Sequence, residues 1–375
     1  MTRNSNYDVL IVGGGLAGLC AALHLSRAGV KVLVIERHPY PHHKVCGEYI
    51  SNEVLPYLKS LDFDPLSHGA IPIDNFLISN ESGDEISTSL PLGGFGMSRY
   101  TLDHLLYSEA SKYAEVVFNT VEVIQFNAEE FTVQCVNGDA YHASYVVGAY
   151  GKRSGLDKTL QRNFISKRSP WLAVKAHYQY PFPENTVALH NFKGGYCGLS
   201  KTETGAVNAC YLASYNSFKP YGDLSRFQKE VLSENPHLNE FFNIAKPLFE
   251  KPLTISQISF QKKEAVKDHI FMMGDSAGLI HPLCGNGMAM AIHAAKIFSE
   301  MYLDARKKGD INRLELETEY STTWNAYFRS RLRIGRVIQK LLLQPVTARL
   351  GFKAGQMFPG LVRNLIKHTH GSPLQ

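Results

Sequence analysis

The sequence lacks most of the features that mark specialised classes of protein. Its six cysteines lie far apart and form no Cys-x-x-Cys pair, so their spacing indicates neither a zinc site nor a disulfide framework. Hydrophobic residues make up 44% of the chain and charged residues 19%, a composition that excludes a disordered or fibrous protein. We find no internal repeat and no low-complexity tract. At about 150 residues per domain, the 375 residues allow two domains with a cleft between them.

Long uninterrupted hydrophobic runs are also missing. Residues 9–25 are apolar enough to suggest a membrane span, but they contain four glycines and His24 and change from a strand pattern to a helix pattern midway. The first six residues are polar and lead directly into the expected strand, which leaves no room for a signal peptide. With the scattered cysteines, these features predict a cytoplasmic protein in which residues 9–25 form a buried strand and helix.

Acidic residues are absent from the end of the chain. Residues 321–375 contain nine of the 39 Lys and Arg residues and none of the 34 Asp and Glu residues. A basic region interspersed with Leu, Ile, Val and Phe suits an anionic membrane surface or an anionic ligand, and it is equally compatible with a solvated helix face. We expect a hydrophobic or lipid-like substrate and keep peripheral membrane contact through this region open. A nucleic-acid partner is not expected, because no recognised nucleic-acid module is present.

A glycine-rich turn between a strand and a helix is the first strong motif. Residues 9–12 have the pattern of a central parallel strand, residues 13–18 fit GxGxxG, and residues 19–28 have helical spacing. A second strand over residues 31–35 ends at Glu36, whose position suits a hydrogen bond to a ribose. This arrangement predicts a dinucleotide site and leaves FAD and NAD(P) both open. The residues expected to bind the cofactor here are Gly13, Gly15, Leu16, Ala17, Gly18, Glu36 and Arg37.

A second motif distinguishes between the two dinucleotides. An apolar strand over residues 270–273 leads into Gly274-Asp275, and residues 281–288 read His-Pro-Leu-Cys-Gly-Asn-Gly-Met before a helix over residues 289–306. Here the chain resembles the FAD-dependent aromatic hydroxylases of the p-hydroxybenzoate hydroxylase type and, more closely, the geranylgeranyl reductase branch of the same flavoprotein superfamily. The resemblance implies FAD, with Asp275 on the ribityl chain and the amides of Gly287 and Met288 facing the flavin pyrimidine. Independently, a helix N-terminus stabilises the anion that reduced flavin carries. The cofactor residues implied in this part are Gly274, Asp275, Pro282, Gly285, Gly287 and Met288.

Three further segments carry the same resemblance. Residues 44–48 are similar to a segment whose cysteine comes near the isoalloxazine, with Glu48 in place of a glycine. Arg99 is similar to an arginine that contacts FAD, whereas we interpret Asp103 as a first-turn helix charge. Residues 146–154 resemble a GADGxxS motif in which Tyr150 replaces the Asp that hydroxylases link to FAD and NAD(P)H binding.

The chain between these segments has a different pattern. Short alternating apolar stretches from about residue 171 to 260 predict an antiparallel sheet, with residues 75–90 beside it. We therefore predict an α/β fold: a Rossmann-like FAD-binding domain of the glutathione reductase type, an inserted antiparallel β-sheet substrate domain and a helical C-terminus. The expected FAD-binding parts are residues 1–74, 99–165 and 265–316, the substrate-domain parts are residues 75–98 and 166–264, and residues 317–375 form the basic C-terminal region.

Few side chains are candidates for chemistry beyond the flavin. The family layout would bring Cys46, Glu48, Tyr196, His281 and Cys284 near the isoalloxazine. We expect Cys46 or Glu48 to contact substrate, His281 to serve as a proton donor and Tyr196 to bind substrate. No Ser/His/Asp triad or metal cluster is evident, so no metal is expected.

The resemblance implies an FAD-dependent oxidoreductase. Our first hypothesis is a monooxygenase that uses NAD(P)H and O2 to hydroxylate a hydrophobic aromatic, polyketide or isoprenoid substrate. An alternative is the saturation of isoprenoid double bonds, as in geranylgeranyl reductases. A third is a non-redox flavoprotein, such as a cyclase or a membrane-surface binding protein.

Overall fold

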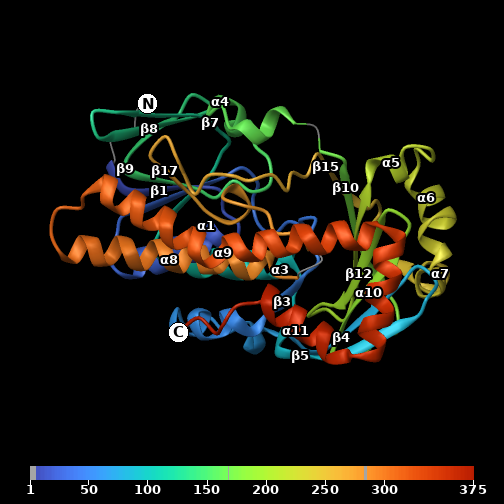
Figure 1. Ribbon diagram of the computed structural model, residues 1–375. Helices are drawn as coiled ribbons and strands as arrows, with labels where there is room; N and C mark the ends of the chain where they lie inside the picture. The colour runs from blue at the N-terminus through green and yellow to red at the C-terminus, as the bar shows by residue number, and fades with distance from the viewer. Residues whose placement is uncertain (1–5, 168, 283–284) are drawn as a thin grey trace.

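Two sheets with surrounding helices make up the computed structural model, which describes residues 6–167, 169–282 and 285–375 (Figure 1). The first sheet and helices α1 and α8 form one half of the molecule, and the second sheet forms the other half. The long helix α9 runs across both halves. This arrangement confirms the predicted α/β fold with an added antiparallel sheet and a helical C-terminus.

The first sheet has a parallel centre in the order β16-β17-β9-β1-β2-β6. Strand β1 pairs in parallel with both β2 and β9, and the apolar run Val9, Leu10 and Ile11 is fully buried. Such a strand is apolar on both faces because helices cover both sides of a parallel sheet. The strands of this sheet are β1 (Asn6–Val12), β2 (Val32–Glu36), β6 (Glu115–Phe118), β7 (Val121–Asn127), β8 (Glu130–Cys135), β9 (Ala140–Gly148), β16 (Val266–Lys267) and β17 (Ile270–Met272).

Helix α1 lies between α3 and α8 beside this sheet. Its buried residues include Leu19, Leu23 and Leu25, so the helix has little polar surface. The helices of this half are α1 (Leu16–Arg27), α2 (Leu55–Ser60), α3 (Arg99–Ala110), α4 (Leu156–Thr159) and α8 (Gly287–Lys307).

The second sheet is antiparallel except where β4 and β11 pair in parallel. Its order is β14-β10-β13-β12-β11-β4-β5-β3, with β15 also paired to β10. The predicted neighbourhood of residues 75–90 and the sheet is therefore confirmed, and β3 and the start of β4 belong to the same sheet. The domain boundaries themselves stay predictions. The strands are β3 (Tyr49–Ser51), β4 (Ile71–Ser79), β5 (Glu85–Gly96), β10 (Trp171–Gln179), β11 (Thr186–Phe192), β12 (Gly195–Lys201), β13 (Val207–Ser214), β14 (Lys246–Pro247) and β15 (Leu253–Ser256).

One face of the second sheet packs on small helices and the other faces inward. Val174 and Ala176 of β10 belong to a core shared with Phe227 and Phe241 of the small helices. Because side chains alternate along a strand, the residues between them point to the opposite face. These helices are α5 (Tyr215–Phe218), α6 (Leu224–Glu230) and α7 (Pro236–Ile244).

The C-terminal region forms three helices: α9 (Arg313–Leu343), α10 (Pro345–Met357) and α11 (Pro359–Thr369). Helix α9 ends at Leu343 and α10 begins with Pro345, because proline cannot continue a helix but suits its first position. Tyr320 of α9 is buried and donates a hydrogen bond to the carbonyl of Met272 at 2.7 Å, which fixes α9 to the first sheet. Among the described residues, none of the helices combines the length and apolar character needed to cross a membrane.

Candidate active site

A cavity of about 890 Å³ lies where the first sheet, the second sheet and helix α11 meet. Its walls include the glycine-rich turn after β1, apolar side chains of the second sheet such as Leu189 and Leu212, and Ile366 of α11. Every predicted cofactor residue except Gly18 lines this cavity, and so do Cys46 and Tyr196. The structure therefore brings together segments that lie far apart in the sequence.

Two glycines in the segment that joins β1 to the first turn of α1 lie so close to backbone carbonyl oxygens that no side chain would fit there. Gly13 has a φ of +107°, and a Cβ there would lie 2.4 Å from the carbonyl oxygen of Ala149. A Cβ on Gly18 would lie 2.0 Å from the carbonyl oxygen of Gly13. Gly15, in contrast, lines the cavity, and a Cβ there would meet only Arg99 Nη2 at 3.7 Å. No side chain caps the N-terminus of α1, so its amides are available to an anion in the cavity.

Glu36 closes the same turn from the end of β2. Its carboxylate accepts hydrogen bonds from the amide of Gly14 at 2.7 Å and from the amide of His38 at 3.2 Å. Glu36 and Arg37 both line the cavity, in agreement with a position beside a ribose.

Arg99 lies at the start of α3, close to the glycine-rich turn. Its guanidinium contacts Asp103 through Nε at 2.6 Å and Nη2 at 2.7 Å, and Lys44 also pairs with Asp103 at 2.8 Å. Our interpretation of Asp103 as a first-turn helix charge is wrong, because the first turn of α3 contains no acidic residue and the side chain of Asp103 is buried in an ion pair. Burial alone would raise the pKa of Asp103, but Arg99 and Lys44 lower it below its usual range. The cavity wall thus carries two cations held by one buried carboxylate.

A second helix N-terminus points at the same cavity. Gly287 and Met288 begin α8, and the preceding Asn286 does not cap that helix with its side chain. Asn286 instead donates a hydrogen bond to the carbonyl of Thr369 in α11 at 2.9 Å. Asp275 lies on the cavity wall after β17, and its carbonyl accepts a hydrogen bond from Lys263 at 2.7 Å. Two uncapped helix ends and the acids beside them fit a flavin dinucleotide, whose central pyrophosphate would lie at the N-terminus of α1 and whose flavin ring would lie at that of α8.

Cys46 lies on the loop of residues 44–48, in which every backbone carbonyl accepts a hydrogen bond. The carbonyls of Lys44, Val45, Cys46 and Gly47 accept hydrogen bonds from four side chains, and the carbonyl of Glu48 accepts one from the amide of Met97 at 3.1 Å. The four donors are Lys175 at 3.2 Å, Lys152 at 2.9 Å, Asn208 at 3.1 Å and Ser200 at 3.3 Å. The thiol of Cys46 lies 3.4 Å from the sulfur of Met288, so this loop places it beside the N-terminus of α8.

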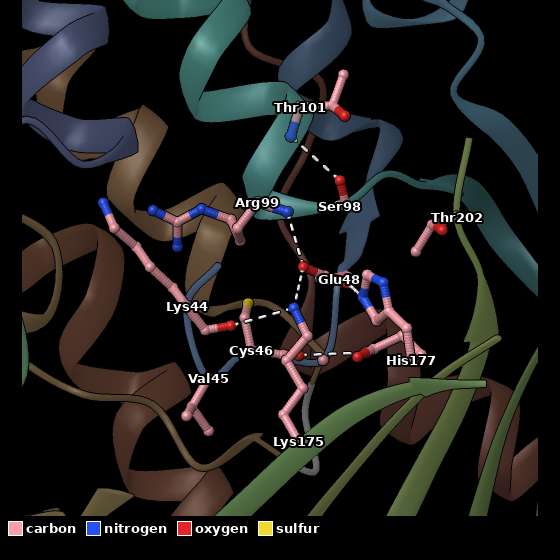
Figure 2. A network of polar contacts seen from close by, with 12 residues as sticks. Lys44, Val45, Cys46, Glu48, Ser98, Arg99, Thr101, Lys175, His177 and Thr202 are labelled. Atoms are coloured by element: carbon pink, nitrogen blue, oxygen red, sulfur yellow. Dashed lines mark hydrogen bonds and ion pairs between the residues drawn. The ribbon is translucent and has the colours of Figure 1, made fainter. Parts of the chain in front are cut away.

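Glu48, the last residue of that loop, is the centre of a buried polar network (Figure 2). Its carboxylate pairs with Lys175, lies 2.7 Å from His177 Nε2 and accepts the amide of Arg99 at 2.7 Å. Glu48 and Lys175 are both fully buried. Burial raises the pKa of Glu48, but Lys175 and His177 outweigh it and lower that pKa below its usual range. Glu48 does not line the cavity, and its carboxylate is occupied by Lys175, His177 and the amide of Arg99. This position favours a role in holding the loop, and the predicted contact with substrate stays a prediction.

Donor atoms of His43, Glu48 and His177 lie within 4.8 Å of one another, close enough to hold a metal ion. The buried ammonium group of Lys175 already neutralises this carboxylate. A divalent cation next to Lys175 would face strong repulsion. The absence of a metal stays a prediction.

His281 lies outside the cavity wall, packed against the rings of Phe260, Trp171 and Tyr196. Burial lowers the pKa of His281 to about 3, so the ring is neutral near pH 7. These features do not favour the predicted role as proton donor. Tyr150, at the position of the family's Asp, lines the cavity and accepts a hydrogen bond from Arg162 at 3.3 Å. Cys284 lies outside the described residues.

We predicted no role from the sequence for Lys175 and His177, which hold Glu48, or for α11 as a cavity wall. One signal was present in the expected strand of residues 171–180: a lysine and a histidine two residues apart, and therefore on one face of an otherwise apolar strand. A charged residue inside such a strand indicates a buried partner.

The fold and the site together define a dinucleotide-binding flavoprotein. The chain belongs to the family described as FAD binding domain, whose model matches residues 6–302. It is 25% identical over 338 residues to a digeranylgeranylglycerophospholipid reductase of Methanosarcina acetivorans, covering 85% of this chain and 80% of the relative. It is also 25% identical over 358 residues to conditioned medium factor receptor 1 of Dictyostelium discoideum, covering 86% and 68%.

Solved structures share this fold at lower identity. The flavin-dependent brominase Bmp2 superposes with a TM-score of 0.78 at 16% identity, over 97% of this chain and 93% of the brominase. A geranylgeranyl bacteriochlorophyll reductase-like protein from Thermoplasma acidophilum superposes with a TM-score of 0.74 at 19% identity, over 91% and 88%. These findings confirm the resemblance to the hydroxylase and geranylgeranyl reductase superfamily, and they place the chain among FAD-dependent oxidoreductases.

Proposed function

We propose that this protein is an FAD-dependent oxidoreductase that saturates carbon–carbon double bonds of an isoprenoid lipid. The observation that carries the proposal is the placement of the Cys46 thiol, 3.4 Å from Met288 at the N-terminus of α8 and on the wall of an extended cavity. Relatives such as the Methanosarcina acetivorans protein are named as reductases of a digeranylgeranyl lipid, which supports this choice over hydroxylation.

Each part of the cavity has a role in this reaction. Reduced FAD supplies a hydride to one carbon of the double bond when the cofactor is bound. Arg99 and the N-terminus of α1 would hold the negative pyrophosphate of bound FAD, and the amides of Gly287 and Met288 would stabilise negative charge on its flavin ring. The thiol of Cys46 donates the proton that the second carbon requires, and water returns a proton to the thiolate. NAD(P)H is the proposed electron donor.

The wall on the side of the second sheet selects the substrate. It includes Leu189, Leu199, Leu212 and Ile255, which exclude water and bind an apolar chain through the hydrophobic effect. Because these contacts are not directional, the cavity favours a flexible apolar chain over one particular head group.

Hydroxylation by O2 and NAD(P)H remains the second candidate. It is favoured by the aromatic side chains on the same wall, Phe76, Tyr196 and Tyr211, which are suited to a flat aromatic ring. The two candidates differ in the atoms that they add to the product.

Product mass separates these functions directly. The purified protein, reduced chemically without oxygen, is mixed with a detergent-dispersed geranylgeranyl lipid, and the lipid is analysed by mass spectrometry. We expect a gain of two hydrogen atoms per double bond. A product that forms only in air with NAD(P)H and gains an oxygen atom would replace the proposal with hydroxylation. Unchanged lipid and no substrate-dependent oxidation of the flavin, across isoprenoid and aromatic compounds, would favour a non-redox flavoprotein.

A further inference from the structure

Helices α10 and α11 expose a row of large apolar side chains. The row consists of Val346, Leu350, Met357, Phe358, Leu361 and Leu365, whose exposed fractions range from 43% for Leu365 to 72% for Met357. We call this row, with the basic residues beside it, the C-terminal face. Single exposed apolar residues are common on proteins, but six of them on two consecutive helices and their junction indicate a contact surface.

The fold does not use this face, because each helix already buries its other side. Phe352 of α10 is buried, and Gly355 packs against Ile86 of β5 and Val362 of α11. On α10, Val346, Leu350 and Met357 recur at helical spacing, so they share one side of the helix, away from that contact. The outer apolar row is therefore free to bind something else.

Positive charge accompanies the apolar row. Arg349, Lys353, Arg363 and Lys367 are exposed on the same two helices. In the part of the chain that the structure describes, none of the four forms an ion pair with an acidic residue. Residues 321–375 contain no Asp or Glu, so α10 and α11 themselves carry only positive charge, and an acidic residue beside them is Glu85 of β5, whose carbonyl accepts a hydrogen bond from Gln356. The partner of this face must be both anionic and apolar.

An anionic bilayer has both properties in one plane. Amphipathic helices with Lys and Arg flanking large apolar residues lie in the headgroup region, where the apolar side chains reach the acyl boundary and the cations pair with lipid phosphates. We propose that the C-terminal face docks helices α10 and α11 on an anionic lipid bilayer.

The docked helix is also a wall of the cavity. Ile366 and Thr369 of α11, and His370 directly after it, line the cavity, whereas Leu361 and Leu365 are exposed. Thr369 is tied to Asn286 at the start of α8 (2.9 Å), and the chain after α11 is tied by Leu374 to the carbonyl of Glu53 (2.8 Å). The bilayer would thus lie one helix away from the cavity. A route for a lipid from the bilayer into the cavity rests on the proposed function, but the docking does not.

Sedimentation with vesicles tests the docking without any turnover. The intact FAD-loaded protein is mixed with vesicles of equimolar phosphatidylcholine and phosphatidylglycerol, and in parallel with phosphatidylcholine alone. We expect binding to the anionic vesicles, weaker binding at high salt and little binding to the neutral ones. Lys353→Gln should weaken the partition about five-fold, the effect of one basic residue near a charged surface, whereas Lys229→Gln on α6 should leave it unchanged.

An apolar pair of variants tests the insertion itself. Leu350→Asp should abolish vesicle binding, whereas Leu314→Asp, at a similarly exposed position in the first turn of α9, should not. Equal binding of Leu350→Asp and the unmodified protein would overturn the proposal, as would equal binding to the two kinds of vesicle. A dimer that Leu350→Asp dissociates, with no vesicle binding, would assign the face to a second copy of the chain. Because the reductase assay uses detergent-dispersed lipid, failure of docking and failure of the proposed reaction give different results.

Discussion

Glu48 occupies a position where a similar segment of the superfamily carries glycine, and the structure gives the physical consequence. It has a φ of +56°, in the region that glycine adopts without strain. Its carboxylate is the only acidic partner that the described residues provide for the buried Lys175. A strained backbone and a buried ion pair both lower the stability of the folded protein, so both are expected where they have a role. Here that role is to position the loop that carries Cys46.

Glu48→Gln should therefore destabilise the protein by about 3 kcal/mol, because it leaves the Lys175 ammonium buried without a carboxylate. Urea unfolding measures the change. The double variant Glu48→Gln with Lys175→Met should recover part of the loss, since no charge is then left unpaired. Equal stability of the single variant and the unmodified protein would contradict the buried pair.

The buried carboxylates of Glu48 and Asp103 predict how the free energy of unfolding depends on pH. The pKa values of Glu48 and Asp103 are both lowered in the folded protein, Glu48 by Lys175 and His177 and Asp103 by Arg99 and Lys44, each against the effect of burial. Their contribution is therefore complete above the unfolded pKa values of about 4 and is lost as the pH falls below them. Unfolding free energies measured from pH 7 downward should decline through this range, and Glu48→Gln should show a shallower decline.

Asp275 provides a test of the cofactor site at a single residue. Asp275→Ala should fold but purify with about ten-fold weaker flavin retention, because it loses a hydrogen bond between a charged group and the cofactor. The flavin absorbance per protein chain is the measurement, and Asp268→Ala, at a half-exposed acid in the turn before β17, is the matched control. A fully yellow Asp275→Ala protein would remove this residue from the site.

At the scale of elements, the strands and helices that we predicted correctly belong to motifs that are local in sequence. The turn after β1 and the segment before α8 have strand, glycine turn and helix consecutive in sequence, so the pattern alone identifies them. The contacts between Glu48 and Lys175 join residues 127 positions apart, and α11 reaches the cavity from the end of the chain. No local pattern encodes such pairings, which depend on how the two sheets pack. Asp103 was misread for the same reason, because one of its two partners, Lys44, lies outside its own helix.

Variants at two glycines of the β1–α1 unit test the packing of the helix and the binding of the cofactor independently. Gly18→Ala should lower stability by about 2 kcal/mol, because its Cβ would lie 2.0 Å from the carbonyl oxygen of Gly13 and α1 would have to shift. Gly15→Ala has space for its Cβ and should fold normally, but its methyl group would occupy the position that the pyrophosphate approaches. The unfolding temperature and the flavin content are measured for both variants. Gly18→Ala should mainly lower the unfolding temperature, whereas Gly15→Ala should mainly lower the flavin content. Flavin retained in full by Gly15→Ala would contradict a pyrophosphate at this turn.

At the scale of the whole molecule, the two sheets have separate tasks within one cavity. The turns and helices beside the first sheet carry the residues predicted to bind FAD, and the second sheet and α11 supply the apolar wall. The division predicts that substrate binding can change without loss of FAD, provided that the altered residue lies on the wall far from the glycine-rich turn.

Val187 of β11 is such a residue, because it lines the cavity and packs with Tyr49 and Leu90 beside α11. Val187→Phe should narrow this end and raise the KM for a geranylgeranyl lipid about ten-fold, since each lost methylene contact is worth roughly 0.8 kcal/mol and about two are displaced. The flavin content and the reduction of a short prenyl substrate should stay unchanged, and Val187→Ala, which widens the same place, serves as the control. If Val187→Phe lost FAD instead, the two sheets would not have separate tasks, and the lipid chain would have to be placed elsewhere in the cavity.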